Sequence, residues 1–91
     1  MNDRRPVGTH PFPTTIAGCD VIDTARIAPR DGELADLAVI TGYDPSRPDD
    51  RAYVVWDAAV RTDKWTAYSG LYDLSYEQAI GEFERRVHQR I

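Results

Sequence analysis

The amino-acid sequence predicts a small α+β domain, in which an antiparallel meander sheet of about four strands packs one face against a single C-terminal α-helix. The first observation is that two apolar segments with two-residue alternation flank a short polar break at residues 62–63, which is typical of a β-hairpin. The second is that the last residues place apolar side chains three and four positions apart, as in an amphipathic helix. The third is the length of 91 residues, which favours one domain.

Proline and glycine mark the irregular part of the first half of the chain. They interrupt residues 1–13 repeatedly, so we expect an irregular N-terminal arm there and a single domain over residues 14–91. β-Branched and apolar residues predict a strand over residues 14–22, with Gly18 at a bulge or a close approach. A second strand is expected over residues 34–43, although its first residues are also compatible with a short helix.

The strongest strand pattern covers residues 51–72. A two- or four-residue turn centred on Thr62 and Asp63 places nearly all apolar groups on one face, whereas a three-residue turn scatters them over both faces. We favour the four-residue turn, because Thr-Asp is a poor pair for a type I′ turn. The predicted cross-strand pairs are Val60 with Trp65, Ala58 with Ala67, Trp56 with Ser69 and Val54 with Leu71.

The C-terminal helix is predicted from its cap and from its apolar stripe. Ser75 and Gln78 form a capping-box pattern, and Glu82 and Arg86 are spaced for an ion pair on one helix face. The stripe consists of Tyr76, Ala79, Ile80, Phe83, Val87 and Ile91. We expect the helix to cover the sheet face that carries both tryptophans, because that face is the richer in apolar groups.

On the opposite face, the same register gathers tyrosines. The predicted interface residues are Tyr53, Val55, Tyr68, Gly70 and Tyr72. An exposed aromatic patch of this kind is typical of an interaction surface, and we interpret it as the contact for a protein partner or for a second copy in a homodimer. Two alternatives are open: the arm folds back through Val7 and Phe12 and covers the patch, or the patch is a small-molecule site.

The excess negative charge lies in the middle of a chain whose net charge is −4. The acidic segment comprises Asp31, Glu33, Asp36, Asp44, Asp49 and Asp50. Its simplest role is to solvate an exposed segment, and the alternative is docking in a basic groove of another protein. Nucleic acid is disfavoured as a partner because there is no basic stripe, although aromatic residues on strands keep a single-stranded nucleic-acid binder as an alternative.

Few residues suit catalysis or metal binding. His10, Cys19 and His88 match no zinc or Cys/His spacing, and we interpret them as a residue of the flexible arm, a small buried hydrophobe and a helix C-terminal cation. We therefore predict no catalytic residue, no cofactor and no metal. The alternative is an enzyme or ligand-binding domain with a pocket between helix and sheet, for which Asp57 beside Tyr68 is the candidate pair.

The sequence also lacks the signals of export and of membrane insertion. No apolar stretch follows the first charged residues, and no apolar run approaches the ~20 residues of a membrane span, so we expect a cytoplasmic protein with no membrane contact. The hypothesis that these features favour is a small, non-enzymatic protein-interaction or regulatory module.

Overall fold

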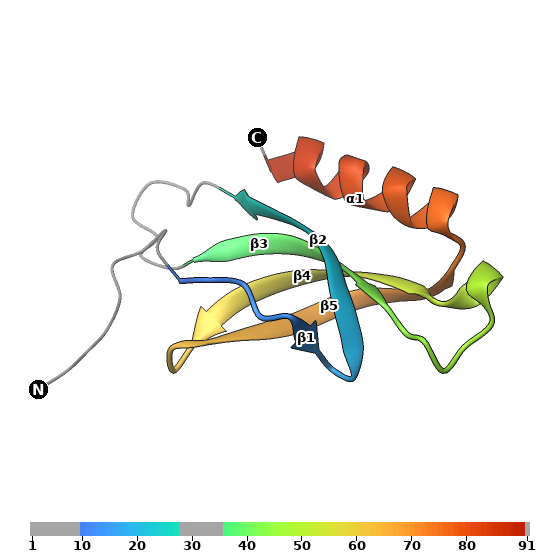
Figure 1. Ribbon diagram of the computed structural model, residues 1–91. Helices are drawn as coiled ribbons and strands as arrows, with labels where there is room; N and C mark the ends of the chain where they lie inside the picture. Colours follow the sequence, from blue (N-terminus) through green and yellow to red (C-terminus); the bar gives the residue numbers. More distant parts are fainter. Residues whose placement is uncertain (1–9, 28–35, 91) are drawn as a thin grey trace, which may run out of the picture.

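The computed structural model describes residues 10–27 and 36–90 and confirms the α+β fold. An antiparallel meander of five strands carries one C-terminal helix, and the strands lie side by side in chain order (Figure 1). The elements are β1 (Thr15–Ile16), β2 (Cys19–Ile27), β3 (Leu37–Tyr43), the 3-10 turn η1 (Asp49–Arg51), β4 (Tyr53–Arg61), β5 (Lys64–Leu74) and α1 (Tyr76–Arg90). Within the described residues, no helix has the length and apolar character needed to cross a membrane.

The fifth strand arises because the segment predicted as one strand folds back on itself. Ala17 and Gly18 both have positive φ, 51° and 80°, and they form a two-residue turn between β1 and β2. Gly18 therefore lies in a turn and not at the predicted bulge. The bulge of β2 lies between Val21 and Asp23, at Ile22.

The hairpin of β4 and β5 turns more tightly than predicted. Thr62 and Asp63 have φ values of 53° and 59°, so they form a two-residue turn with left-handed backbone in place of the predicted four-residue loop. The predicted pairs next to this turn are confirmed: Val60 lies opposite Trp65, and Ala58 opposite Ala67.

Two bulges in β5 change the register toward the far end of this hairpin. Ser69 and Asp73 have positive φ, 53° and 60°, and each lies where two residues of β5 oppose one residue of β4. The observed pairs are Val55 with Leu71 and Tyr53 with Leu74, in place of the predicted pairs of Trp56 with Ser69 and Val54 with Leu71. Each bulge reverses the face on which the following β5 side chains lie.

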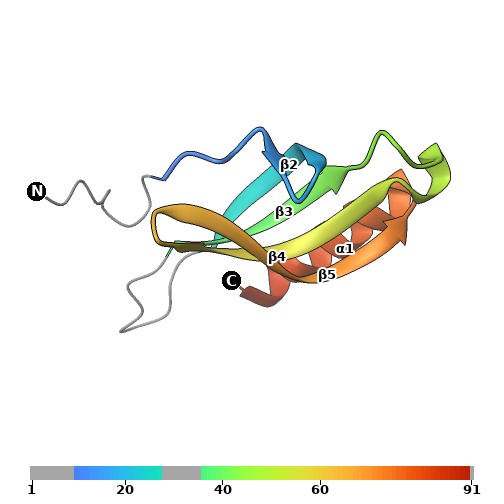
Figure 2. The ribbon, with the colours of Figure 1, turned by 90° about the horizontal axis from the view of Figure 1, so that it is seen from below.

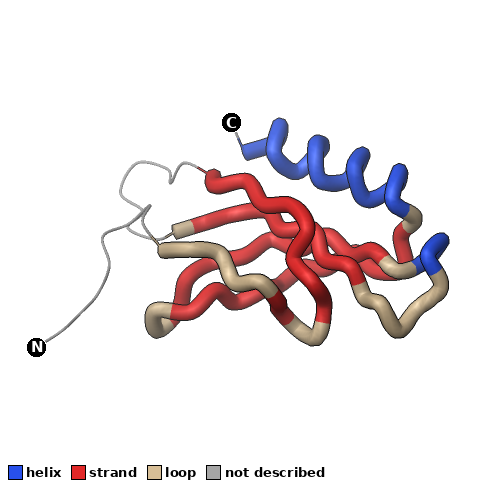
Figure 3. The backbone as a smooth tube through the Cα atoms, viewed as in Figure 1, coloured by secondary structure: helices blue, strands red, loops and turns tan. Residues whose placement is uncertain are grey.

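Helix α1 packs on the sheet face that carries Val55, so its predicted position over the tryptophans is wrong. The buried residues between helix and sheet are Ile27, Val39, Val55, Leu74 and Ala79, with Leu37, Tyr53, Phe83 and Val87 packed around them. The core on the other face contains Cys19, Ala38, Ile40, Val54, Trp56 and Ala58, and Phe12, Ile16, Val21, Trp65 and Ala67 pack against it. Figures 1 and 3 show α1 on one side of the strands and β1 on the other.

The space that Trp56 needs explains this choice of face. Its side chain is among the largest that are fully buried, and it lies against glycines of both neighbouring strands. A Cβ at Gly42 would lie 2.6 Å from Cζ3 of the indole, and a Cβ at Gly70 would lie 2.7 Å from Cδ1. Bulges increase the twist of a sheet, and Figure 2 shows strongly twisted strands. Ile16 of β1 and Phe12 pack against the Trp56 core. Helix α1 covers the opposite face.

The predicted helix cap is confirmed, and an ion-pair network joins the helix to the sheet. The Ser75 N–H donates to Gln78 Oε1 at 2.9 Å, and the Gln78 N–H donates to Ser75 Oγ at 3.1 Å. The predicted pair of Glu82 and Arg86 is also present, at 2.6 Å. Arg86 reaches Asp57 of β4 at 3.3 Å, so the network fixes α1 across the sheet.

This network makes the stability of the fold sensitive to acid. Hydrogen bonds from Arg85 and then from Arg86 lower the pKa of the Glu82 carboxyl from 4.5 to about 2. A group with a depressed pKa in the folded state contributes stability that is present above its unfolded pKa and is lost as the pH falls through the folded pKa. The contribution of Glu82 is therefore complete above pH 4.5 and disappears toward pH 2.

We expect Glu82→Gln to lower the free energy of unfolding by about 2 kcal/mol at neutral pH, because the variant loses charged hydrogen bonds to two arginines. The difference from the wild type should shrink steadily below pH 4.5. Urea denaturation at a series of pH values measures it. Glu84→Gln is the matched control, because Glu84 is exposed and forms no ion pair with a described residue. A loss for Glu82→Gln that is equal at all pH values would contradict this explanation.

Candidate functional site

The predicted tyrosine face does not exist as one exposed surface. Val55 is fully buried beneath α1, and Tyr53 is half-buried on the same face. The space above Gly70 is filled by Trp56 and Tyr72 and is not open to another molecule. Tyr68 and Tyr72 are exposed, but the bulge at Ser69 places them on opposite faces: Tyr68 lies opposite Asp57 on the helix side, and the Tyr72 hydroxyl accepts a hydrogen bond from Trp56 Nε1 at 3.0 Å.

A different tyrosine cluster lies on the helix side of the sheet. The rings of Tyr43 and Tyr53 have centroids 5.2 Å apart, and those of Tyr53 and Tyr76 are 5.4 Å apart. Tyr76 is 55% exposed at the start of α1. Of the predicted interface residues only Tyr53 belongs to this cluster. Tyr43 and Tyr76 were missed because the helix was expected on the other face.

Next to this cluster, a groove runs between β2 and α1. The groove encloses about 200 Å³. Its apolar lining includes Ile22, Tyr76, Ala79, Ile80 and Phe83, with Thr41 as a polar member. Ile22 is 45% exposed and Ile80 is 40% exposed, so large apolar side chains face water on both walls. The bulge in β2 places Ile22 there, because an extra residue turns its side chain to the same face as Asp23.

The charged residues that line this groove are both acids. Asp23 and Glu84 border it, and neither forms an ion pair with a described residue. Asp23 accepts a hydrogen bond from the backbone N–H of Thr24. Arg85 and Arg86, which follow Glu84 in α1, are both bound to Glu82. The groove therefore combines exposed apolar side chains with two carboxylates that form no ion pair with a described residue.

The outer edge of β2 is open beside the groove. Strand β1 pairs only with Cys19 and Asp20, and one further hydrogen bond joins the Val21 N–H to the Thr14 carbonyl at 2.9 Å. From Ile22 onward no other strand among the described residues lies along this edge of β2. The groove is thus bordered by a helix on one side and, on the other, by a strand edge that no other described strand pairs with.

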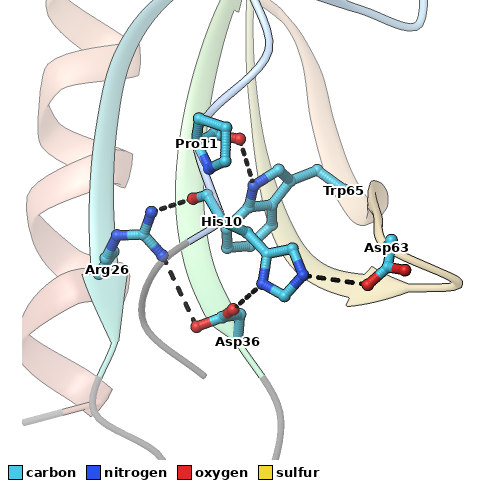
Figure 4. A network of polar contacts seen from close by, with 6 residues as sticks. All are labelled: His10, Pro11, Arg26, Asp36, Asp63 and Trp65. Atoms are coloured by element: carbon cyan, nitrogen blue, oxygen red, sulfur yellow. Dashed lines mark hydrogen bonds and ion pairs between the residues drawn. The ribbon is translucent and has the colours of Figure 1, made fainter. Parts of the chain in front are cut away.

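On the opposite face, His10 lies in a polar clamp near the turn between β4 and β5 (Figure 4). Its Nδ1 atom contacts Asp36, its Nε2 atom lies 3.3 Å from Asp63 Oδ1, and Arg26 lies 3.6 Å from Asp36. An ionised carboxylate only accepts hydrogen bonds, so both His10 contacts are hydrogen bonds only in the imidazolium form. His10 is 8% exposed, and its predicted place in a flexible segment is wrong.

The residues after His10 are also held against the sheet. Arg26 donates a hydrogen bond to the His10 carbonyl, and Trp65 Nε1 donates to the Pro11 carbonyl at 3.0 Å. Phe12 stacks on the Trp65 indole with ring centroids 4.8 Å apart, and the guanidinium of Arg26 lies 4.7 Å from the Phe12 ring. The described part of the arm, residues 10–13, is therefore folded back, but over the tryptophan side and not over the tyrosines.

The geometry of the clamp suits a structural role, in which it holds residues 10–13 against the sheet, better than a catalytic one. A general base needs a ring nitrogen within reach of a substrate, and both nitrogens of His10 already face carboxylates of the chain. Those carboxylates lie at opposite sides of the ring (Figure 4). Among residues 10–27 and 36–90, no three His, Cys, Asp or Glu side chains converge so that they could hold a metal ion.

Cys19, His88 and Asp57 are the other residues for which the sequence suggested chemistry. Cys19 is buried, and burial raises the pKa of its thiol, which makes it a poor nucleophile. His88 is exposed on α1. Asp57 lies opposite Tyr68 as predicted, but Arg86 binds its carboxylate, and neither Asp57 nor Tyr68 lines the groove between β2 and α1.

The acidic segment is not one exposed surface. Asp36 is 6% exposed in the clamp, which corrects its predicted solvation. Asp44 accepts hydrogen bonds from Ser46, Asp49 accepts one from the Tyr43 hydroxyl, and Asp50 lies 4.0 Å from Arg51. Asp31 and Glu33 lie outside the described residues. The described acids of this segment thus bind neighbouring groups of the chain.

These features define the described part of the chain as an α+β meander domain in which α1 and β2 form a groove lined by apolar and acidic side chains, beside a strand edge that no other described strand covers. Compared with known proteins, the chain matches no family model, no curated protein and no solved structure.

Proposed function

We propose that this protein is a non-enzymatic interaction module that binds a segment of a protein partner in the groove between β2 and α1. The observation that carries the proposal is the coincidence of exposed Ile22, Tyr76 and Ile80 with the carboxylates of Asp23 and Glu84. Exposed apolar groups of this size mark interaction sites. The partner segment has an apolar anchor residue flanked by lysine or arginine.

The size of the groove supports a partner side chain over a free small molecule. Its volume of about 200 Å³ is below the roughly 300–1,000 Å³ of typical small-molecule pockets. That space suits one or two apolar side chains. The neighbouring rings of Tyr53 and Tyr76 extend the apolar surface along the helix, which suits a longer segment.

Charge supports a basic partner over a second copy or a nucleic acid. In a two-fold contact between identical grooves, the acids of one groove would face those of the other, and like charges oppose such a contact. Phosphate groups would meet the same repulsion. A segment with lysine or arginine instead gains electrostatic attraction during approach.

The proposal is tested by affinity selection of a phage-displayed library of random linear peptides on the full chain. We expect enrichment of peptides with apolar anchors and basic neighbours. Ile22→Asp should weaken their binding about 30-fold, the effect of removing a central apolar contact. The matched control is Leu71→Asp: Leu71 and Ile22 are both 45% exposed on strands, but Leu71 lies on β5 at the opposite edge of the sheet.

Three outcomes would overturn the proposal. The first is that no peptide is enriched, and the second is that Ile22→Asp and Leu71→Asp weaken binding equally. The third is a homodimer, measured by light scattering, that Ile22→Asp converts to a monomer, because the groove would then hold a second copy.

The acidic rim of the groove, formed by Asp23 and Glu84, gives a separate prediction. Glu84→Gln should weaken the binding of the selected basic peptides about 5-fold at low salt, and the loss should shrink as salt is added. Asp50→Asn is the control, because Asp50 is an exposed acid of η1 outside the groove. Isothermal titration at two salt concentrations measures the effect. Equal losses in both variants would indicate a general effect of net charge and would contradict a role for the rim.

A further inference from the structure

We infer that the partner segment binds as an added β-strand along the outer edge of β2, antiparallel or parallel to it, as a sixth strand of the sheet. The inference rests on the proposed function and specifies how the partner is bound. An extended peptide that joins a sheet edge gains affinity from backbone hydrogen bonds and specificity from pockets for alternate side chains. Both requirements are met at this edge.

The first requirement is a regular, unpaired edge. From Asp23 to Ile27, β2 pairs with β3 residue by residue and without interruption, so its outward-directed backbone groups are evenly arranged. This stretch contains no proline and no lysine, the residues that commonly protect an edge. Strand β1 ends its pairing at Cys19 and Asp20 and leaves this stretch uncovered by any described strand.

The opposite edge of the sheet, β5, differs in this respect. Its two bulges, at Ser69 and Asp73, interrupt the regular backbone beside the exposed Leu71 and Tyr72. Its regular part begins at Lys64. Bulges and an edge lysine are devices that prevent strand addition. The bulges of β5 thus interrupt its edge along its length, whereas the bulge of β2 at Ile22 precedes the regular stretch from Asp23 to Ile27, beside which no other described strand pairs.

The second requirement is a pocket that receives alternate side chains. Successive residues of an added strand point to opposite faces of the sheet. On the helix side of β2 they reach the groove of Ile22, Thr41 and Ile80. Every second residue of the partner therefore enters the groove, where apolar side chains meet Ile80 and basic ones meet Glu84.

Backbone methylation of the selected peptide tests this geometry without altering the protein. An N-methyl group removes one N–H donor and obstructs pairing on that side. In an added strand, alternate amides point toward β2, so N-methylation should weaken binding roughly 30-fold at every second position and have little effect between them. A peptide bound as a helix would instead lose affinity at nearly every internal position, because each amide is used inside the helix.

Amide hydrogen exchange of the protein supplies an independent readout. Peptide binding should slow the exchange of outward-directed amides in residues 22–27 and leave β5 unchanged. Strand addition is overturned if the methylation series lacks two-residue periodicity, or if the β2 amides exchange at the same rate with and without the peptide. In that case the proposed function still stands if Ile22→Asp weakens binding more than Leu71→Asp. If no peptide is selected, both proposals fall together.

Discussion

Replacing His10 by alanine is expected to lower the free energy of unfolding by about 3 kcal/mol, because the buried carboxylate of Asp36 loses a hydrogen-bonding partner. Asp36 is 6% exposed, and in this variant it loses its contact with the imidazole while keeping Arg26 at 3.6 Å. Asp63 loses its contact with the imidazole at the same time. The residues that the clamp holds against Trp65 also lose their anchor.

Urea denaturation of the full chain measures this loss. His88→Ala is the matched control, because His88 is exposed on α1, and we expect it to change the stability by less than about 0.5 kcal/mol. Equal stability losses in the two variants would mean that the clamp does not contribute to the fold. Asp36→Asn provides a second variant of nearly the same shape, which should also be destabilised, since it removes the charge that His10 and Arg26 share.

The second large effect is expected for Gly42→Ala, which should destabilise the fold by about 2–3 kcal/mol. The added methyl group would lie 2.6 Å from Cζ3 of Trp56. The indole cannot move away easily, because it is 1% exposed and also lies against Gly70 of β5. Either the indole or the backbone of β3 must shift, and packing within the Trp56 core is lost.

Gly81→Ala is the control for this substitution, and it should have the opposite sign. Gly81 lies within α1, and a Cβ there would meet no atom within 4 Å. Alanine favours a helix over glycine by about 1 kcal/mol, so we expect a gain of that size. Thermal denaturation of both variants measures the pair of effects. A Gly42→Ala variant as stable as the wild type would show that the indole has room to move.

The sheet and the helix could be predicted because their signals are local in the sequence. The capping box of Ser75 and Gln78 appears in the structure as two reciprocal hydrogen bonds. The alternation on both sides of Thr62 and Asp63 gave the correct pairing next to the turn. Such patterns depend on neighbouring residues alone and need no knowledge of the rest of the fold.

The face that the helix covers could not be predicted, because both faces of the sheet are apolar. The choice depends on the room for Trp56, which is provided by glycines of two other strands. The bulges that separate Tyr68 from Tyr72 were also hidden, since Ser69 and Asp73 adopt positive φ without being glycine. One undetected bulge is enough to move every following side chain to the other face.

The clamp and the groove depend on contacts between distant parts of the chain. His10 meets Asp36 and Asp63, which are 26 and 53 positions away, and no spacing rule links them. Only one wall of the groove could be predicted from the sequence. Ile80 belongs to the predicted helix stripe, but Ile22 reaches the groove only through the β2 bulge. Tertiary structure was needed to bring these residues together.

The central claim, that the groove between β2 and α1 is the interaction surface, is tested most directly by chemical-shift mapping. The full chain, labelled with ¹⁵N, is titrated with a peptide selected from the library. We predict that the largest shifts fall on residues 22–27 of β2 and on the first half of α1, around Ile80. Shifts concentrated on β5, or around Trp65 and the clamp on the opposite face, would contradict the claim.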